Sequence, residues 1–112
     1  MQRHAWVIGL RPEKVEEYKA LHANAWPEVL KMIKDCGLQN YSIYLRKLPD
    51  GGLYLFSYVE YVGEDFDADM AKMAADPVTQ KWWDLCKPCQ TPLANRVGDE
   101  WWSTMEEVFH CE

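Results

Sequence analysis

The chain has no long apolar run, and this absence limits where the protein can act. A transmembrane helix needs roughly 18 or more consecutive apolar residues, and no stretch of the 112 residues approaches that length. Residues 1–6 also lack the extended apolar core of a secretion signal. We therefore expect a cytoplasmic protein with no membrane partner.

Basic runs and several well-known catalytic motifs are also missing. The formal net charge is −6, and no run of lysine and arginine is interleaved with aromatic residues. A protein that binds a phosphate backbone needs a basic surface, so we expect no nucleic-acid partner. The sequence contains no phosphate-binding glycine loop, no nucleophile elbow and no H-E-x-x-H zinc motif. The common routes to nucleotide, covalent and zinc chemistry are therefore absent.

Cysteine is present but does not form a convincing redox or metal pattern. Without a secretion signal, reduced thiols are the expectation for the four cysteines, which are Cys36, Cys86, Cys89 and Cys111. The Cys86-Lys87-Pro88-Cys89 pair follows a predicted helix, whereas a thioredoxin-type pair begins one. A zinc site would need two more ligands, and His110 and Cys111 are neighbours that would point to opposite faces of a strand. We expect no metal.

An acidic triplet resembles the start of a calcium loop. Asp65, Asp67 and Asp69 have the alternating spacing, but Met70 stands where such a loop needs glycine for its sharp turn. Carboxylates are also favoured in the first turn of a helix. The triplet therefore predicts the solvated beginning of a helix.

What the chain does contain is apolar and aromatic side chains. Hydrophobic residues make up 48% of the sequence, and six tryptophans are present. At this length a single domain over residues 1–112 can bury a sizeable core. Tryptophan combines a large apolar surface with one N–H donor, so it suits cores, interfaces and carbohydrate sites.

The hydrophobic pattern predicts an ordered series of elements. We expect strands at 3–10, 38–48 and 53–62, with a turn at 49–52, and a last strand at 105–111. We expect helices at 11–22, 27–36 and 65–75, and another that begins at Pro77. This β-α-β-β-α-β order is that of a ferredoxin-like α+β fold, an antiparallel sheet with helices on one face. Because the helix-free face must be covered, we expect a homodimer of the α+β barrel type.

Tyr18 and His22 are the candidates for chemistry. Residues four apart on a helix lie one above the other, and the charged Glu16, Glu17 and Lys19 occupy the other side. An inward imidazole beside a phenol suits proton transfer to a small polar molecule such as a sugar. The alternative is a core histidine with one satisfied hydrogen bond.

The Trp82-Trp83 pair has two interpretations as well. Neighbouring residues on a helix point about 100° apart, so one indole could pack in the core while the other lines a cleft. A sugar presents a C–H face that can stack on an indole. The alternative is that both rings are core residues.

The motifs together resemble the L-rhamnose mutarotase family, over nearly the whole chain. The resemblance is carried by Glu16-Glu17-Tyr18-x-x-x-His22-x-x-x-Trp26-Pro27-Glu28, Asn40-Tyr41-Ser42-Ile43-Tyr44-Leu45, Gln80-Lys81-Trp82-Trp83 and Met105-Glu106-Glu107-Val108-Phe109. It implies a dimeric ferredoxin-like fold and an aldose 1-epimerase, an isomerase that interconverts the α and β anomers of a 6-deoxy-hexose. L-rhamnose is the first choice of substrate and L-fucose the alternative within the family.

The resemblance also implies roles for individual residues. His22 matches the proton donor, and the positions that contact the sugar match Tyr18, Tyr41, Trp82 and Trp83. No metal or organic cofactor is implied. Two hypotheses from other classes stay open at this stage, a ferredoxin-like dimeric monooxygenase and a non-catalytic sugar-binding module. Whether Trp101 or Trp102 contributes to the pocket is also open.

Overall fold

Prolines and aspartates determine where the helices begin. The computed structural model describes residues 1–112. Pro27 and Pro77 occupy first-turn positions of helices, where the missing N–H costs nothing. The side chain of Asp76 accepts hydrogen bonds from the backbone N–H and the hydroxyl of Thr79 at 2.9 and 2.8 Å. The four α-helices are α1 (Val15–Ala23), α2 (Pro27–Asp35), α3 (Phe66–Ala75) and α4 (Pro77–Cys86), with 3₁₀ turns η1 (Pro12–Lys14) and η2 (Lys87–Cys89).

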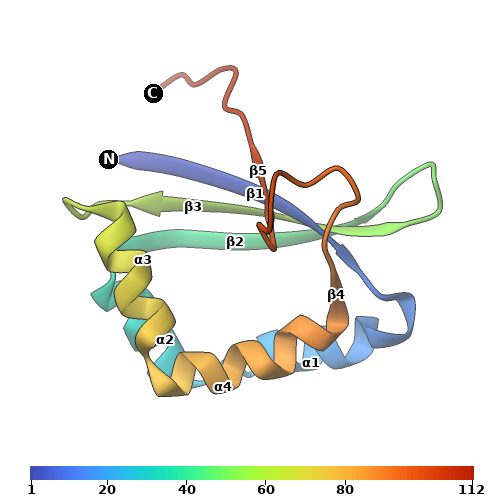
Figure 1. The fold of residues 1–112 in the computed structure, drawn as a ribbon, viewed down its shortest axis with the longest axis horizontal. Coiled ribbons are helices and arrows are strands. Elements are labelled where there is room, and N and C mark those ends of the chain that lie inside the picture. Colours follow the sequence, from blue (N-terminus) through green and yellow to red (C-terminus); the bar gives the residue numbers. More distant parts are fainter.

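One antiparallel sheet forms the other layer of the molecule. Its strands are β1 (Gln2–Leu10), β2 (Leu38–Lys47), β3 (Leu53–Tyr61), β4 (Gln90–Thr91) and β5 (Ser103–Met105). The strand order is β2-β3-β1-β4, and β5 also pairs with β1. Figure 1 shows α1, α2 and α4 lying along one face of the sheet, with α3 leading down to them from the end of β3. This is the α+β, ferredoxin-like arrangement predicted from the order of elements.

Strand alternation decides which side chains meet the helices. Ile8 and Leu10 of β1 and Leu55 of β3 belong to a buried cluster that also contains Tyr18, Val29 and Trp82. Residues two apart on a strand share a face, so the helix-facing set extends along β3 to Ser57, Val59 and Tyr61, which are all buried. The core therefore lies between the sheet and the helix layer.

The opposite face of the sheet carries aromatic side chains and no helix. Phe56 is half-buried, and it pairs with Val7 on one side and with Tyr44 on the other. Tyr44 is 66% exposed. The last residues of the chain run on this side of the sheet, away from the helix layer (Figure 1). None of the helices combines the length and the apolar character that a bilayer-spanning helix requires.

The C-terminal part differs from the prediction. The strand predicted at 105–111 is wrong: the strand is Ser103–Met105, and residues 106–112 have no regular structure. These residues have no neighbouring strand to pair with, and Val108 and Phe109 are 88% and 80% exposed. The tail is held instead by a salt bridge from Arg3 to Glu107 at 3.0 Å. The two-residue strand β4 was not predicted, because Pro88 and Pro92 on either side indicate a loop.

Candidate active site

The candidate site is built on helix α1. Its predicted face is confirmed: Tyr18 is 5% exposed and His22 is half-buried. The two rings stack with their centroids 4.2 Å apart and their planes 25° apart. Because the residues are one helical turn apart, the Nδ1 of His22 also reaches the backbone carbonyl of Tyr18, at 2.9 Å.

This contact determines which tautomer the neutral imidazole adopts. A carbonyl oxygen only accepts, so Nδ1 of His22 carries the hydrogen and donates it to Tyr18. The second nitrogen, Nε2, then presents a lone pair. Burial lowers the pKa of His22 below its ordinary value, and the bond to the carbonyl offsets only part of this effect. At neutral pH the side chain is therefore an uncharged imidazole with a basic Nε2.

One tryptophan contacts this imidazole, and a second packs behind the first. The ring of Trp82 meets His22 edge-on, with centroids 5.2 Å apart, and it meets Trp26 in the same way at 5.3 Å. Edge-to-face geometry is favourable for aromatic pairs. Trp82 is 6% exposed, so it belongs to both the core and the wall of the site.

Trp83 points elsewhere, as its position on the helix predicts. It is half-buried and packs against both buried clusters of the molecule. The ammonium group of Lys87 lies 5.7 Å from the centroid of its ring. Trp83 therefore keeps an accessible surface, whereas Trp82 is almost fully covered.

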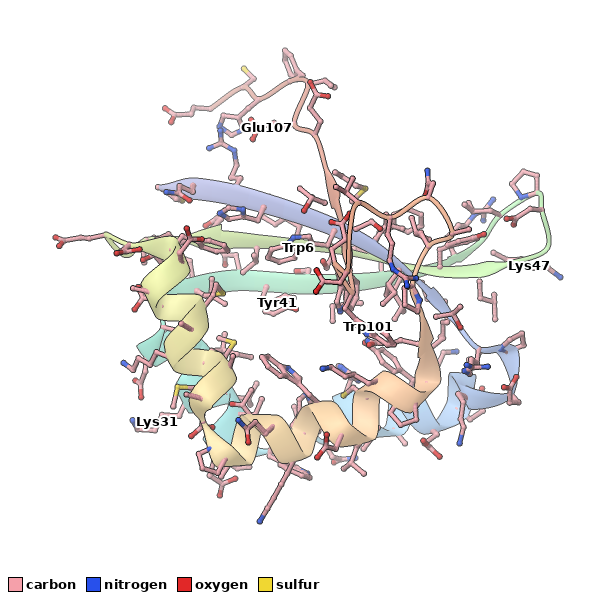
Figure 2. The ribbon with its side chains drawn as sticks, in the orientation of Figure 1. Trp6, Lys31, Tyr41, Lys47, Trp101 and Glu107 are labelled. Carbon is pink, nitrogen blue, oxygen red and sulfur yellow. The ribbon has the colours of Figure 1, made fainter.

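Tyr41 approaches the cluster from the sheet. It lies two residues before Ile43, which pairs with the helix-facing Ser57, and Figure 2 labels it on the helix side of β2. Although Tyr41 is 39% exposed, burial raises the pKa of its hydroxyl to about 12. A partly accessible ring enclosed by the sheet and the helices accounts for both observations. The phenols of Tyr18 and Tyr41 are also close enough that charge on one raises the pKa of the other.

Gln90 is hydrogen-bonded to Tyr18, and Trp101 is hydrogen-bonded to Gln90. The side-chain amide of Gln90, on β4, donates from Nε2 to the hydroxyl of Tyr18 at 3.2 Å. Its Oε1 accepts from the indole N–H of Trp101 at 2.7 Å. Figure 2 labels Trp101 between the sheet and the helix layer. No sequence motif indicates a role for Gln90, whereas Trp101 is one of the two tryptophans whose contribution to the pocket the sequence leaves open.

The Cys86-x-x-Cys89 pair closes the end of α4 and is not poised for reaction. All four cysteines are free, and these two are buried. Burial raises the pKa of Cys86 to about 12. Burial also raises the pKa of Cys89, whose thiol donates to a carboxylate oxygen of Glu17 at 3.3 Å. Both groups are therefore thiols at neutral pH, and the thiolate is the nucleophile.

The acidic triplet begins a helix, as predicted. The side chain of Asp65 caps α3 by accepting from the backbone N–H of Ala68 at 3.1 Å, and Asp67 and Asp69 lie in the first turn. Nowhere do three or more His, Cys, Asp or Glu side chains gather in a way that could hold a metal ion.

The candidate site does not coincide with either of two surface hollows. One, of about 310 Å³, adjoins a neighbouring stripe of α1 and is lined by Glu17, Ala20, Leu21, Asn24 and Trp26. The other, of about 360 Å³, lies between the start of β1 and the C-terminal residues. Neither contains His22, so the chemistry of the side chains locates the candidate site, and the size of a hollow does not.

Comparison with known proteins identifies the family. The family model described as L-rhamnose mutarotase matches residues 3–111. An L-rhamnose mutarotase from Oceanobacillus iheyensis is 34% identical, and one from Phocaeicola vulgatus is 42% identical; each match covers 100% of both chains. The chain belongs to the L-rhamnose mutarotase family. The relatives of this family are carbohydrate epimerases, which are isomerases.

Solved structures show the same fold. A crystal structure of an L-rhamnose mutarotase from Formosa agariphila superimposes with a TM-score of 0.73 at 24% identity, covering 100% of both chains. The tetracenomycin F2 cyclase of Streptomyces glaucescens reaches a TM-score of 0.72 at 16% identity, over 100% of this chain and 98% of that one. At these identities the likeness concerns the fold alone. The mutarotase family therefore uses an architecture that also carries unrelated chemistry.

Proposed function

We propose that the protein interconverts the α and β anomers of L-rhamnose, with His22 as the acid–base residue. One observation carries the proposal: an uncharged imidazole is fixed by its Nδ1 hydrogen bond to the Tyr18 carbonyl, packs against the rings of Tyr18 and Trp82, and has a basic Nε2. Full-length relatives in this family are named L-rhamnose mutarotases, which favours that sugar over L-fucose and over a monooxygenase or binding module.

The proposed reaction moves a single proton between two oxygens of the sugar. Nε2 of His22 accepts the proton of the anomeric hydroxyl, and the bond from C1 to the ring oxygen breaks to leave an aldehyde. The imidazolium then donates that proton to the former ring oxygen, which is the donor role that the family resemblance implies. Both oxygens are bonded to C1, so one imidazole can serve both. Rotation about C1–C2 and the reverse sequence close the ring as the other anomer.

The same side chains suit the sugar in other respects. We propose that Tyr18 and Tyr41 bind its hydroxyl groups and that Trp82 and Trp83 contact its apolar C–H face. Burial raises the pKa of both phenols, so they remain protonated donors at neutral pH. The reaction changes no oxidation state, and general acid–base catalysis contributes roughly 10²–10⁴-fold. We therefore propose that the protein needs no metal or organic cofactor.

We also propose a homodimer in the cytoplasm. The helix-free face of the sheet exposes Tyr44, and the tail beside it exposes Val108 and Phe109. A second copy of the chain would cover these apolar groups. Free thiols, three of the four of them buried, are favoured by a reducing compartment.

The test is the rate of anomer exchange, measured by NMR saturation transfer on L-rhamnose, with L-fucose in parallel. We expect the wild-type protein to accelerate exchange and His22→Ala to remove the acceleration. His110→Ala is the matched control, because His110 is exposed in the C-terminal tail. Wild-type exchange in the His22→Ala variant, with its circular dichroism unchanged, would refute the proposed role of His22.

A further inference from the structure

Gln90 is a buried side chain whose two polar ends are both occupied. It is 5% exposed, and its amide connects Trp101 to the hydroxyl of Tyr18. The direction of each hydrogen bond follows from chemistry. An indole N–H only donates, so the amide atom 2.7 Å from it is the oxygen. The other end of the amide is then the NH₂ group, which only donates.

This fixed amide constrains the hydroxyl of Tyr18. A phenolic hydrogen prefers the plane of its ring, where it has two positions. The Gln90 donor occupies one side of the oxygen, so the hydrogen of Tyr18 points to the other. Gln90 donates the only hydrogen bond that this hydroxyl makes to the protein, and the proton of Tyr18 is bound by no side chain or backbone group.

Gln90 and Trp101 are each positioned by further contacts. Gln90 pairs with Leu10 in the sheet, and β4 lies so close to β1 that a Cβ on Gly9 would stand 2.8 Å from the carbonyl oxygen of Thr91. Trp101 also lies near Lys87, whose ammonium is 6.0 Å from the Trp101 centroid and 5.7 Å from that of Trp83. The amide therefore has little freedom to turn over.

We infer that Gln90, locked by Trp101, is a positioning residue that holds Tyr18 as a hydrogen-bond donor to the sugar. The inference rests on the proposed function, because it assigns Tyr18 to the sugar. It adds a specificity element outside the aromatic cluster: the site distinguishes a ligand that offers an acceptor to Tyr18 from one that offers a donor. Trp101 takes part in this arrangement through the hydrogen bond from its N–H to Gln90, and Trp102 makes no such bond.

The test is a double-mutant cycle between Gln90→Met and Tyr18→Phe, read as the Kd for L-rhamnose from tryptophan fluorescence. Methionine keeps the length of the side chain and removes both hydrogen bonds. A neutral hydrogen bond contributes about 0.5–1.5 kcal/mol, so we expect Gln90→Met to raise Kd about 2- to 13-fold. In the Tyr18→Phe background the same change should have almost no effect, because the hydroxyl that Gln90 orients is gone.

Two further variants separate positioning from folding. Trp101→Phe keeps one aromatic ring and removes the second ring together with its N–H, so it should also raise Kd, and again only when Tyr18 is present. Gln80→Met is the control, since Gln80 is exposed on α4 and bonds the backbone of Ala74, and it should leave Kd unchanged. None of these changes should shift the pH midpoint of the exchange rate.

The outcomes distinguish the inference from the proposed function. An equal rise in Kd in both Tyr18 backgrounds, or no rise in either, would overturn the role of Gln90 while leaving mutarotase activity in place. Coupled Kd values in a wild-type protein that does not accelerate exchange would refute the proposed reaction and support the positioning. A wild-type protein that binds no L-rhamnose would overturn both.

Discussion

Replacing Trp82 by phenylalanine tests whether this ring is part of the buried core. Trp82 is 6% exposed and makes edge-to-face contacts with His22 and Trp26. Phenylalanine lacks the second ring of the indole, which removes roughly 50 Å² of buried apolar surface, or about 1.3 kcal/mol at ~25 cal/mol per Å². Weakening the two aromatic contacts costs up to about 1 kcal/mol more. We therefore expect a loss of about 2 kcal/mol of stability.

Thermal unfolding followed by circular dichroism measures this loss. For a domain of this size, 1 kcal/mol corresponds to a shift in Tm of about 4 °C, so Tm should fall by about 8 °C. Trp83→Phe is the matched control, because Trp83 is only half-buried, and its Tm should fall by less than half as much. An unchanged Tm for Trp82→Phe, or a larger fall for Trp83→Phe, would refute the assignment of Trp82 to the core.

Two further predictions concern the ends of α4 and the thiols. Asp76→Ala removes the side chain that caps α4 by accepting hydrogen bonds from Thr79. We expect it to lower the free energy of unfolding, measured by urea titration, by about 1 kcal/mol, within the usual range of about 0.5–2 for a lost helix cap. An unchanged urea midpoint would contradict the capping role of Asp76. In the native protein the exposed thiol of Cys111 should react rapidly with a thiol reagent. The three buried thiols, those of Cys36, Cys86 and Cys89, should react only on unfolding. Rapid reaction of two or more thiols would contradict the burial of these three cysteines.

Local signals explain why much of the fold was predictable. Prolines begin helices at Pro27 and Pro77, and Gly37 adopts a φ of 80° directly after Cys36, the C-cap of α2. The i, i+4 spacing of Tyr18 and His22 predicts that the two side chains share one face of the helix, and in the structure their rings stack within one turn of α1. Strand alternation groups Tyr41 with Ile43 on one side of β2, and the structure shows that this side faces the helices.

Long-range contacts explain what was missed. Gln90 meets Tyr18 across 72 positions of sequence, and neither residue type indicates the other as a partner. The β-compatible run at 105–111, which includes Val108 and Phe109, predicts a strand, but no strand of the same chain pairs with residues 106–112. Strand pairing and amide bridges depend on what the folded chain brings alongside, and a local pattern contains no such information.

The most direct test of the central claim is the pH dependence of anomer exchange by the wild-type protein. The proposed mechanism requires an uncharged His22 whose Nε2 accepts the first proton. Burial lowers the pKa of this imidazole below its ordinary value near 6.5. Exchange should therefore be constant through neutral pH and fall to half at a pH below 6.5. The same lowered pKa means that His22 contributes stability above pH 6.5 that is lost as pH falls through its folded-state pKa. An exchange rate that rises as His22 becomes protonated, or a midpoint above 6.5, would contradict the account.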